Sequence, residues 1–247
     1  MKHHKATIVV SLLWAVCVAA GTCTRGRDWS EIYLGACPSV GADGKKFVFE
    51  WNDSIWIAPT AGGTAERLTP EESLESWPAL SPDGTRVAYL SSRDGGNKIF
   101  VMDLATMQVS QVSRHSEPTA LSAWAPDGKS LVGAALRDHS ATPTGWRIAL
   151  FLPDGREVFP FSHVRSRDAA LSPDGRLLAF SRRGENIYRK RRSGKTPEDA
   201  EIWLYDMRTK EFRRPATASE NAFFPRWRPD GKAFYYLGRR PGASVVG

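Results

Sequence analysis

The sequence lacks the features that mark several large classes of protein. After the N-terminal region it has no long apolar run, so no membrane span is expected in the rest of the chain. It has only three cysteines, and none follows Cys37, which excludes a fold that depends on disulfide bonds. No spacing of cysteine, histidine or carboxylates matches a metal site, so neither a metal nor another cofactor is expected.

Histidine is also scarce, and this limits the catalytic possibilities. Only His115, His139 and His163 follow the N-terminal region, and no nucleophile-elbow sequence accompanies them. A serine hydrolase would need one of them beside a nucleophile and an acid. We therefore expect no catalytic residue in this chain. An autonomous hydrolase acting through one of these histidines is the remote alternative.

The net charge does not by itself predict a partner. The formal charge is +7, but the basic residues are scattered through the repeats, and only the segment Arg182 to Lys195 is dense. No helical basic region or RNA-binding motif accompanies the charge. Nucleic acid is therefore not expected as a partner.

Residues 1–22 have the layout of a secretory signal peptide. A basic start at Lys2 to Lys5 precedes the apolar run Ala6 to Ala20, which is short for a membrane span. We expect cleavage after Ala20 or Thr22 and export to the periplasm or the extracellular space. A lipoprotein anchored through Cys23 is the less favoured alternative. After cleavage, Cys23 and Cys37 could pair in an oxidising compartment.

The strongest signal is a repeated turn. An Asp-Gly pair recurs with turn glycines 40, 44, 47 and 56 residues apart, a spacing typical of four-stranded propeller blades. Each copy lies between two short apolar runs, which predicts a hairpin. The five copies are Ala42-Asp43-Gly44, Pro82-Asp83-Gly84, Pro126-Asp127-Gly128, Pro173-Asp174-Gly175 and Pro229-Asp230-Gly231.

Two further predicted strands follow each of the first four hairpins, as in Ile99 to Asp103 and Val109 to Ser113. The sequence thus predicts an all-β protein, a β-propeller of four-stranded antiparallel blades with four complete and a fifth begun. Residues 23–247 form this partial propeller. We place the blades roughly at residues 38–69, 76–113, 120–162, 168–217 and, incomplete, 223–247.

Other repeated residues have structural interpretations. The turn aspartates Asp43, Asp83, Asp127, Asp174 and Asp230 are expected to bond their own backbone and not to hold a metal. The tryptophans that recur in the blades are assigned to blade packing and not to a ligand cage: Trp56, Trp77, Trp124, Trp146, Trp203 and Trp227.

One loop has functional character. Between two predicted strands, Arg182 to Lys195 holds seven Lys or Arg residues among fourteen. Such insertions project from one face of a propeller, where charged donors can hold acidic groups or peptide C-termini. A solvated loop without a ligand is the alternative. The candidate binding residues are Tyr188, Arg189, Lys190, Arg191 and Arg192.

The repeat resembles the Pro-Asp-Gly propeller repeat that TolB-like envelope proteins and tricorn-type proteases share. Two stretches favour the second family. Phe49 to Pro59, followed by Gly62-Gly63 and Arg67-Leu68-Thr69, resembles the first blade of tricorn-type proteases. Tyr188 to Gly194, leading to Ile202 to Asp206, is similar to the basic and aromatic insertion of that family.

The resemblance, which covers roughly Tyr33 to Tyr236, implies a six-bladed domain and a function. Tricorn-type enzymes follow this propeller with a second propeller, a PDZ module and a serine-peptidase domain, none of which this chain contains. The archaeal enzyme holds a peptide's carboxylate with paired arginines here, whereas the corresponding region, Ser113 to Trp124, offers Arg114 and His115. We expect a non-catalytic region of an exported tricorn-like serine protease that binds or gates peptides for the missing peptidase domain. The alternative is a TolB-like envelope protein-interaction propeller with no protease attached.

Overall fold

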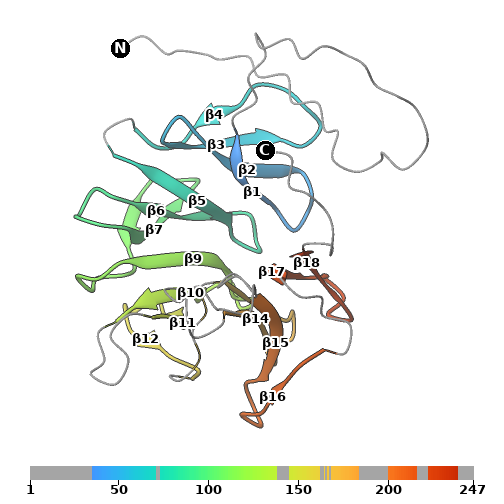
Figure 1. The fold of residues 1–247 in the computed structure, drawn as a ribbon. Helices are drawn as coiled ribbons and strands as arrows, with labels where there is room; N and C mark the ends of the chain where they lie inside the picture. Colours follow the sequence, from blue (N-terminus) through green and yellow to red (C-terminus); the bar gives the residue numbers. More distant parts are fainter. Residues whose placement is uncertain are drawn as a thin grey trace, which may run out of the picture.

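The described part of the chain consists of strands and the turns that join them. The structure, a computed structural model, describes residues 35–70, 73–137, 145–161, 164, 166, 168–183, 200–215 and 222–238. Within these ranges no residue is helical (Figure 1). Consistent with this, the search of the same residues for a helix able to cross a membrane finds none.

The strands form four sheets of four strands and one sheet of two, and consecutive strands pair antiparallel. The first two sheets contain β1 (Ala36–Val40), β2 (Lys46–Trp51), β3 (Ser54–Pro59), β4 (Glu66–Arg67), β5 (Glu75–Leu80), β6 (Arg86–Ser91), β7 (Lys98–Asp103) and β8 (Val109–Gln111). The third and fourth contain β9 (Thr119–Trp124), β10 (Leu131–Leu136), β11 (Trp146–Phe151), β12 (Glu157–Val158), β13 (Ala169–Leu171), β14 (Leu177–Arg183), β15 (Ala200–Asp206) and β16 (Phe212–Arg213). The fifth contains β17 (Ala222–Trp227) and β18 (Phe234–Gly238).

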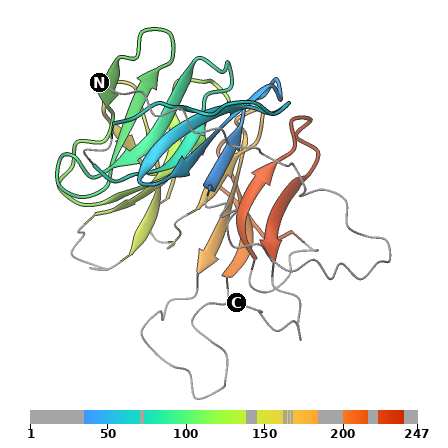
Figure 2. The same ribbon diagram turned by 90° about the horizontal axis from the view of Figure 1, so that it is seen from above.

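The sheets surround a common axis as blades (Figure 1), and Figure 2 shows them after a 90° turn. In Figure 1, β1, β5, β9 and β17 lie nearer the axis than the strands that follow them in their sheets. This confirms the predicted all-β propeller with four complete blades and a fifth begun. The final number of six blades stays a prediction.

Each turn aspartate bonds its own hairpin, as predicted. Asp83 Oδ1 accepts the backbone N–H of Thr85 at 3.1 Å and also the hydroxyl of Ser81. These bonds, the Ser81 hydroxyl first, lower the pKa of Asp83 to about 2. In the other four turns the aspartate Oδ1 likewise accepts the backbone N–H of the residue two positions later; these aspartates are Asp43, Asp127, Asp174 and Asp230. The turn glycines have φ between 64° and 71°, a region that favours glycine.

The core lies between blades. Strand residues alternate in direction, so a sheet that lies between two others packs one face on the preceding blade and the other on the next. On β6, Val87 and Tyr89 pack with Val48 and Ile55 of the first blade. Their neighbours on the same strand, Ala88 and Leu90, pack instead against the third blade.

Two tryptophans tie neighbouring blades together. The indole N–H of Trp124 in the third blade donates to the carbonyl oxygen of Ala79 in the second at 2.8 Å. Trp227 in the fifth blade makes the equivalent bond to Ala170 in the fourth at 3.0 Å. Both tryptophans stand four residues before their turn glycine, so the contact recurs because they occupy the same position of the repeat.

Candidate binding cavity at the propeller axis

One repeated position lies on, or directly before, the first strand of each blade. This position, seven residues before each turn glycine, is occupied by Cys37, Trp77, Leu121, Asp168 and Phe224. Four of the five line a cavity of about 70 Å³, and only Cys37 does not. Leu90, Ala120, Ser122 and Arg226 complete its wall, so four blades contribute to it.

An aromatic pair forms one wall of the cavity. The ring of Trp77 on β5 stacks on that of Phe224 on β17 with centroids 6.0 Å apart and planes 29° apart. The contact joins the second and fifth blades. Trp77 retains 38% of its surface exposed.

Both aromatic residues lie at bulges with an unusual backbone. Trp77 and Phe224 have φ of 52° and 53°, and each precedes a proline. The pairing shifts register at both places. Bulky side chains rarely adopt this region, and each such residue costs on the order of 1–3 kcal/mol. The bulge turns the side chain toward the axis, away from the blade interface.

Asp168 supplies a buried carboxylate to the same cavity. Its residue is 4% exposed. Oδ2 accepts the backbone N–H of Phe224 at 2.7 Å and the hydroxyl of Ser181. Oδ1 is buried and has no hydrogen-bond partner among the described residues.

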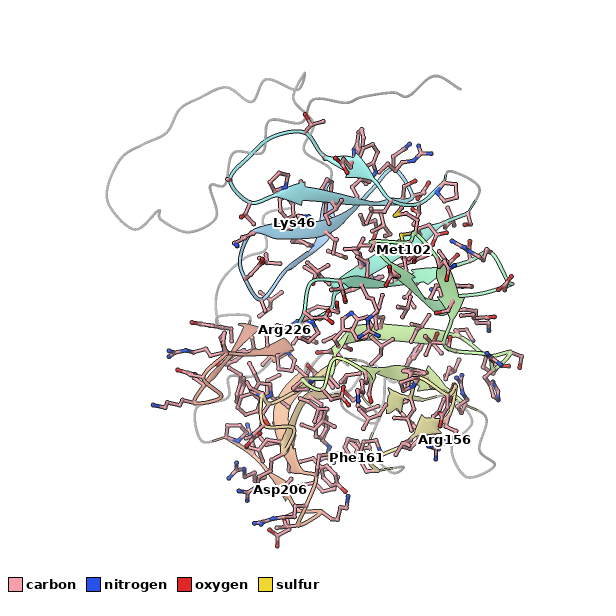
Figure 3. All side chains as sticks on the ribbon, turned by 180° about the vertical axis from the view of Figure 1, so that it is seen from behind. Lys46, Met102, Arg156, Phe161, Asp206 and Arg226 are labelled. Carbon is pink, nitrogen blue, oxygen red and sulfur yellow. The ribbon has the colours of Figure 1, made fainter. Side chains whose placement is uncertain are left out.

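Arg226 brings a positive charge to the same cavity. Its Nη2 donates to the carbonyl of Ser122 at 3.1 Å, across from the fifth blade to the third. Its Nη1 donates to the carbonyl of Pro225 at 2.9 Å. The Arg226 residue is exposed to solvent. Partial desolvation by the neighbouring strands still lowers its pKa, and the charge of Asp168 opposes that change. Figure 3 places Arg226 near the middle of the molecule, where strands of several blades converge.

Comparison with known proteins identifies the propeller. Residues 35–245 match the family described as the tricorn protease N-terminal beta propeller domain. The chain belongs to this family. The match covers the axis residues and all five blades of this tricorn-type propeller.

Individual relatives come from two groups. Tricorn protease homolog 1 of Streptomyces coelicolor is 29% identical over 77% of this chain and 18% of its own length. The TolB homolog of Chlorobium luteolum is 30% identical over 56% of this chain and 31% of its own length. The solved structure of putative TolB from Agrobacterium tumefaciens superposes with a TM-score of 0.67 at 20% identity, over 82% of this chain and 69% of that one. The chain therefore spans less than a third of either curated relative.

Several predicted site residues fall outside the described part of the tricorn-type propeller. These are Tyr188, Arg189, Lys190, Arg191, Arg192, His139, His163 and Cys23. The loop therefore stays a prediction, as does pairing of Cys23 with Cys37. No described residue forms a disulfide bond with Cys37. Burial, followed by the charge of Glu50, raises the pKa of its thiol.

His115 and Arg114 lie in the loop after β8. His115 accepts the backbone N–H of Glu117 on Nδ1 at 3.1 Å, and its carbonyl accepts the ammonium group of Lys98. Both are local contacts that stabilise the loop. The described residues include no cluster of three or more His, Cys, Asp or Glu able to hold a metal ion.

The sequence interpretation was wrong for Trp77 and missed Arg226. Trp77 faces the axis and not a blade interface, because its bulge reverses the direction of its side chain. The sequence pattern carries no signal for Arg226, because this residue belongs to no basic cluster. Seven of the eight lining residues stand five to eight positions before a turn glycine, so an alignment of the repeats on these glycines marks both residues.

Proposed function

We propose that this chain is the peptide-binding propeller of an exported tricorn-like serine protease, and that it binds or gates peptides for a peptidase domain elsewhere in the intact protein. The observation that carries the proposal is the axis cavity. It combines an aromatic wall with one buried carboxylate and one guanidinium. A mostly apolar cavity with a few convergent polar groups is the usual form of a binding site.

The repeat itself favours binding at the axis. Packing positions are similar from blade to blade, whereas Trp77, Leu121, Asp168 and Phe224 differ in size, charge and shape. A ring of unlike side chains can distinguish one ligand from another. The match over residues 35–245 supports a role beside a peptidase.

Peptide binding by the chain tests the proposal directly. A fluorescent mixed-sequence hexapeptide pool should raise fluorescence anisotropy when the protein is added. Trp77→Ala should weaken binding at least about tenfold, because it removes one face of the aromatic wall. Tyr235→Ala, an exposed aromatic on β18, serves as the matched control. Absence of binding by the unaltered chain would contradict the proposal.

The basic loop is proposed as a second contact. Tyr188, Arg189, Lys190, Arg191 and Arg192 would hold acidic groups or the C-terminus of the same peptide. Replacing the four basic residues by glutamine should weaken binding of acidic peptides more than of neutral ones. Equal weakening of both would remove the loop from the site.

A TolB-like envelope interaction propeller is the second candidate. It is favoured by the 30% identity to the TolB homolog of Chlorobium luteolum and by the TM-score of 0.67 to putative TolB from Agrobacterium tumefaciens. The genomic sequence beyond the codon for Gly247 separates the two. A peptidase region there supports the protease, and a stop soon after blade closure supports the envelope module.

Export is part of both candidates and rests on residues 1–22. Cell fractionation of the expressed chain should recover it outside the cytoplasm, shortened at Ala20 or Thr22. N-terminal sequencing of the recovered protein, with lipid analysis, would distinguish this cleavage from lipid attachment at Cys23.

A further inference from the structure

The two aromatic residues of the cavity wall donate their backbone N–H groups to carboxylates. The N–H of Trp77 donates to Oε2 of Glu50 at 3.2 Å, and the N–H of Phe224 donates to Oδ2 of Asp168 at 2.7 Å. In both pairs the carboxylate belongs to the preceding blade. Glu50 lies on β2 of the first blade, and Asp168 directly precedes β13 of the fourth.

These bonds satisfy the one donor that each bulge contains. The two residues that leave the regular pairing are Trp77 and Pro78 in the second blade, and Phe224 and Pro225 in the fifth. Proline has no N–H, so the aromatic residue holds the only backbone donor of its bulge. A carboxylate accepts such a bond more strongly than a neutral carbonyl does.

The backbone of both aromatic residues needs support from its surroundings. Trp77 and Phe224 have φ of 52° and 53°, where bulky residues are rarely found. A residue keeps such a conformation only when neighbouring groups hold it there. The carboxylate of the preceding blade is placed to do this, because it binds the N–H of the strained residue itself.

The repeat does not account for the two acceptors. Glu50 stands six residues after the turn glycine Gly44, whereas Asp168 stands seven residues before Gly175. A contact produced by the repeat would use the same position in both blades. What the two contacts share is a bulged aromatic residue at the axis, so the acceptor goes with that residue and not with the blade pattern.

The shape of the cavity depends on these bulges. The rings of Trp77 and Phe224 stack at 6.0 Å only because both point to the axis. A bulge that relaxes toward regular pairing turns its side chain to the other face of the sheet. Glu50 is not one of the described residues that line the cavity, so any effect of Glu50 on the wall passes through Trp77.

We propose that Glu50 and Asp168 are positioning residues of the axis cavity. Each holds the bulge of the aromatic residue in the next blade and thereby keeps its ring on the cavity wall. The expected effect on peptide affinity rests on the proposed peptide-binding function. The effect on the position of the ring does not, and it can be measured without a ligand.

A double-mutant cycle on the full chain tests whether Glu50 acts through Trp77. Glu50→Leu removes the acceptor at similar size and should weaken binding of the fluorescent hexapeptide pool about tenfold. Adding Glu50→Leu to Trp77→Ala should change affinity by less than about twofold, because the ring that Glu50 positions is already gone. Losses that multiply to about a hundredfold would overturn the proposal.

Conservative and distant variants separate the hydrogen bond from the charge. Glu50→Gln keeps an acceptor oxygen and should bind the pool within about twofold of the unaltered chain. Glu66→Leu removes the same charge from an exposed residue of β4 and is the matched control, with no change expected. A loss with Glu50→Gln as large as with Glu50→Leu would show that the acceptor is not what matters.

The second carboxylate is tested in the same way. Asp168→Asn keeps an acceptor for the N–H of Phe224, whereas Asp168→Leu removes it, so only the second should weaken binding about tenfold. Asp168→Leu also removes the acceptor of the Ser181 hydroxyl. Thermal unfolding checks that each variant is folded, and the Glu50 variants decide the proposal if Asp168→Leu does not fold.

Fluorine NMR reports the ring without any peptide. In protein labelled with 5-fluorotryptophan, the resonance that is missing from Trp77→Ala belongs to Trp77. This resonance should shift in Glu50→Leu and stay in place in Glu50→Gln and Glu66→Leu. An unmoved resonance in Glu50→Leu would overturn the positioning role even if the pool binds, and the proposed function would stand. If the pool does not bind the unaltered chain, the proposed function fails, and a shift confined to Glu50→Leu still supports the positioning role.

Discussion

The inner hairpin of each blade has two regions with opposite sequence behaviour. Its turn has the same Asp-Gly pair in all five blades and makes the same backbone hydrogen bond each time. Seven residues before the turn glycine, the axis position is different in every blade: Cys37, Trp77, Leu121, Asp168 and Phe224.

The difference follows from what each region contacts. The turn must only reverse the chain, and that local requirement is identical in every blade. The axis residues meet residues of other blades, as Trp77 meets Phe224, so each has a different neighbour. Positions that build the repeat are therefore uniform, and positions that face the axis are free to specialise.

The largest loss of stability is expected at Gly133, a buried position on β10 in the sheet of the third blade. A Cβ there would lie 2.1 Å from the carbonyl oxygen of Ala120 and 3.1 Å from the ring of Phe151. Gly133→Ala should lower the free energy of unfolding by about 3 kcal/mol, since buried backbone cannot move aside. Urea unfolding measures the loss. A loss below about 1 kcal/mol would show that the inner strand of the third blade can shift.

A smaller effect is expected at the blade-to-blade tryptophans. Trp124→Phe leaves the carbonyl of Ala79 without its donor in a buried place and should cost about 1–3 kcal/mol in urea unfolding. Trp227→Phe breaks the equivalent bond to Ala170 but should cost less, because Trp227 is only half-buried. Equal losses would mean that burial does not set the strength of this contact.

Replacing a turn glycine should lower the free energy of unfolding only through strain in the backbone. Gly84 has φ of 71°, and a Cβ there would meet nothing within 4 Å. Gly84→Ala should therefore cost about 1 kcal/mol, whereas Gly84→Asn, which tolerates this region, should cost less. Neither should change binding of the hexapeptide pool. A change in binding would contradict the view that the turn positions serve only the fold and the axis positions serve binding.

The smallest effect concerns pH. The pKa of Asp83 in the folded protein is about 2, below its ordinary value of 3.8, chiefly because the Ser81 hydroxyl donates to it. The unfolded chain thus binds more protons in this range. The contribution of the Asp83 carboxylate to stability is therefore present above about pH 4 and is lost as the pH falls toward 2. Asp83→Asn should make the decline in thermal midpoint over that interval less steep. Asp43→Asn is the control, because glycine stands at position 41 where Ser81 stands in the second blade; an equal change there would rule out the hydroxyl as the cause.

The repeat made most of the fold predictable. Turn, strand alternation and spacing are local, so they could be read from one blade at a time and then counted. The bulges were not predicted. The pairs Trp77-Pro78 and Phe224-Pro225 signal an unusual backbone, but a proline by itself does not show which way the preceding side chain turns.

By itself, the sequence determined that the chain forms four-stranded blades, where each hairpin turns and which aspartates hold the turns. These properties depend on neighbours in the chain. Only the tertiary structure decided that Trp77, Asp168, Phe224 and Arg226 share one cavity, because they come from three blades and up to 149 residues separate them. Their meeting depends on how far each blade rotates about the axis and on two backbone bulges, which a pattern of residue types along the chain does not specify.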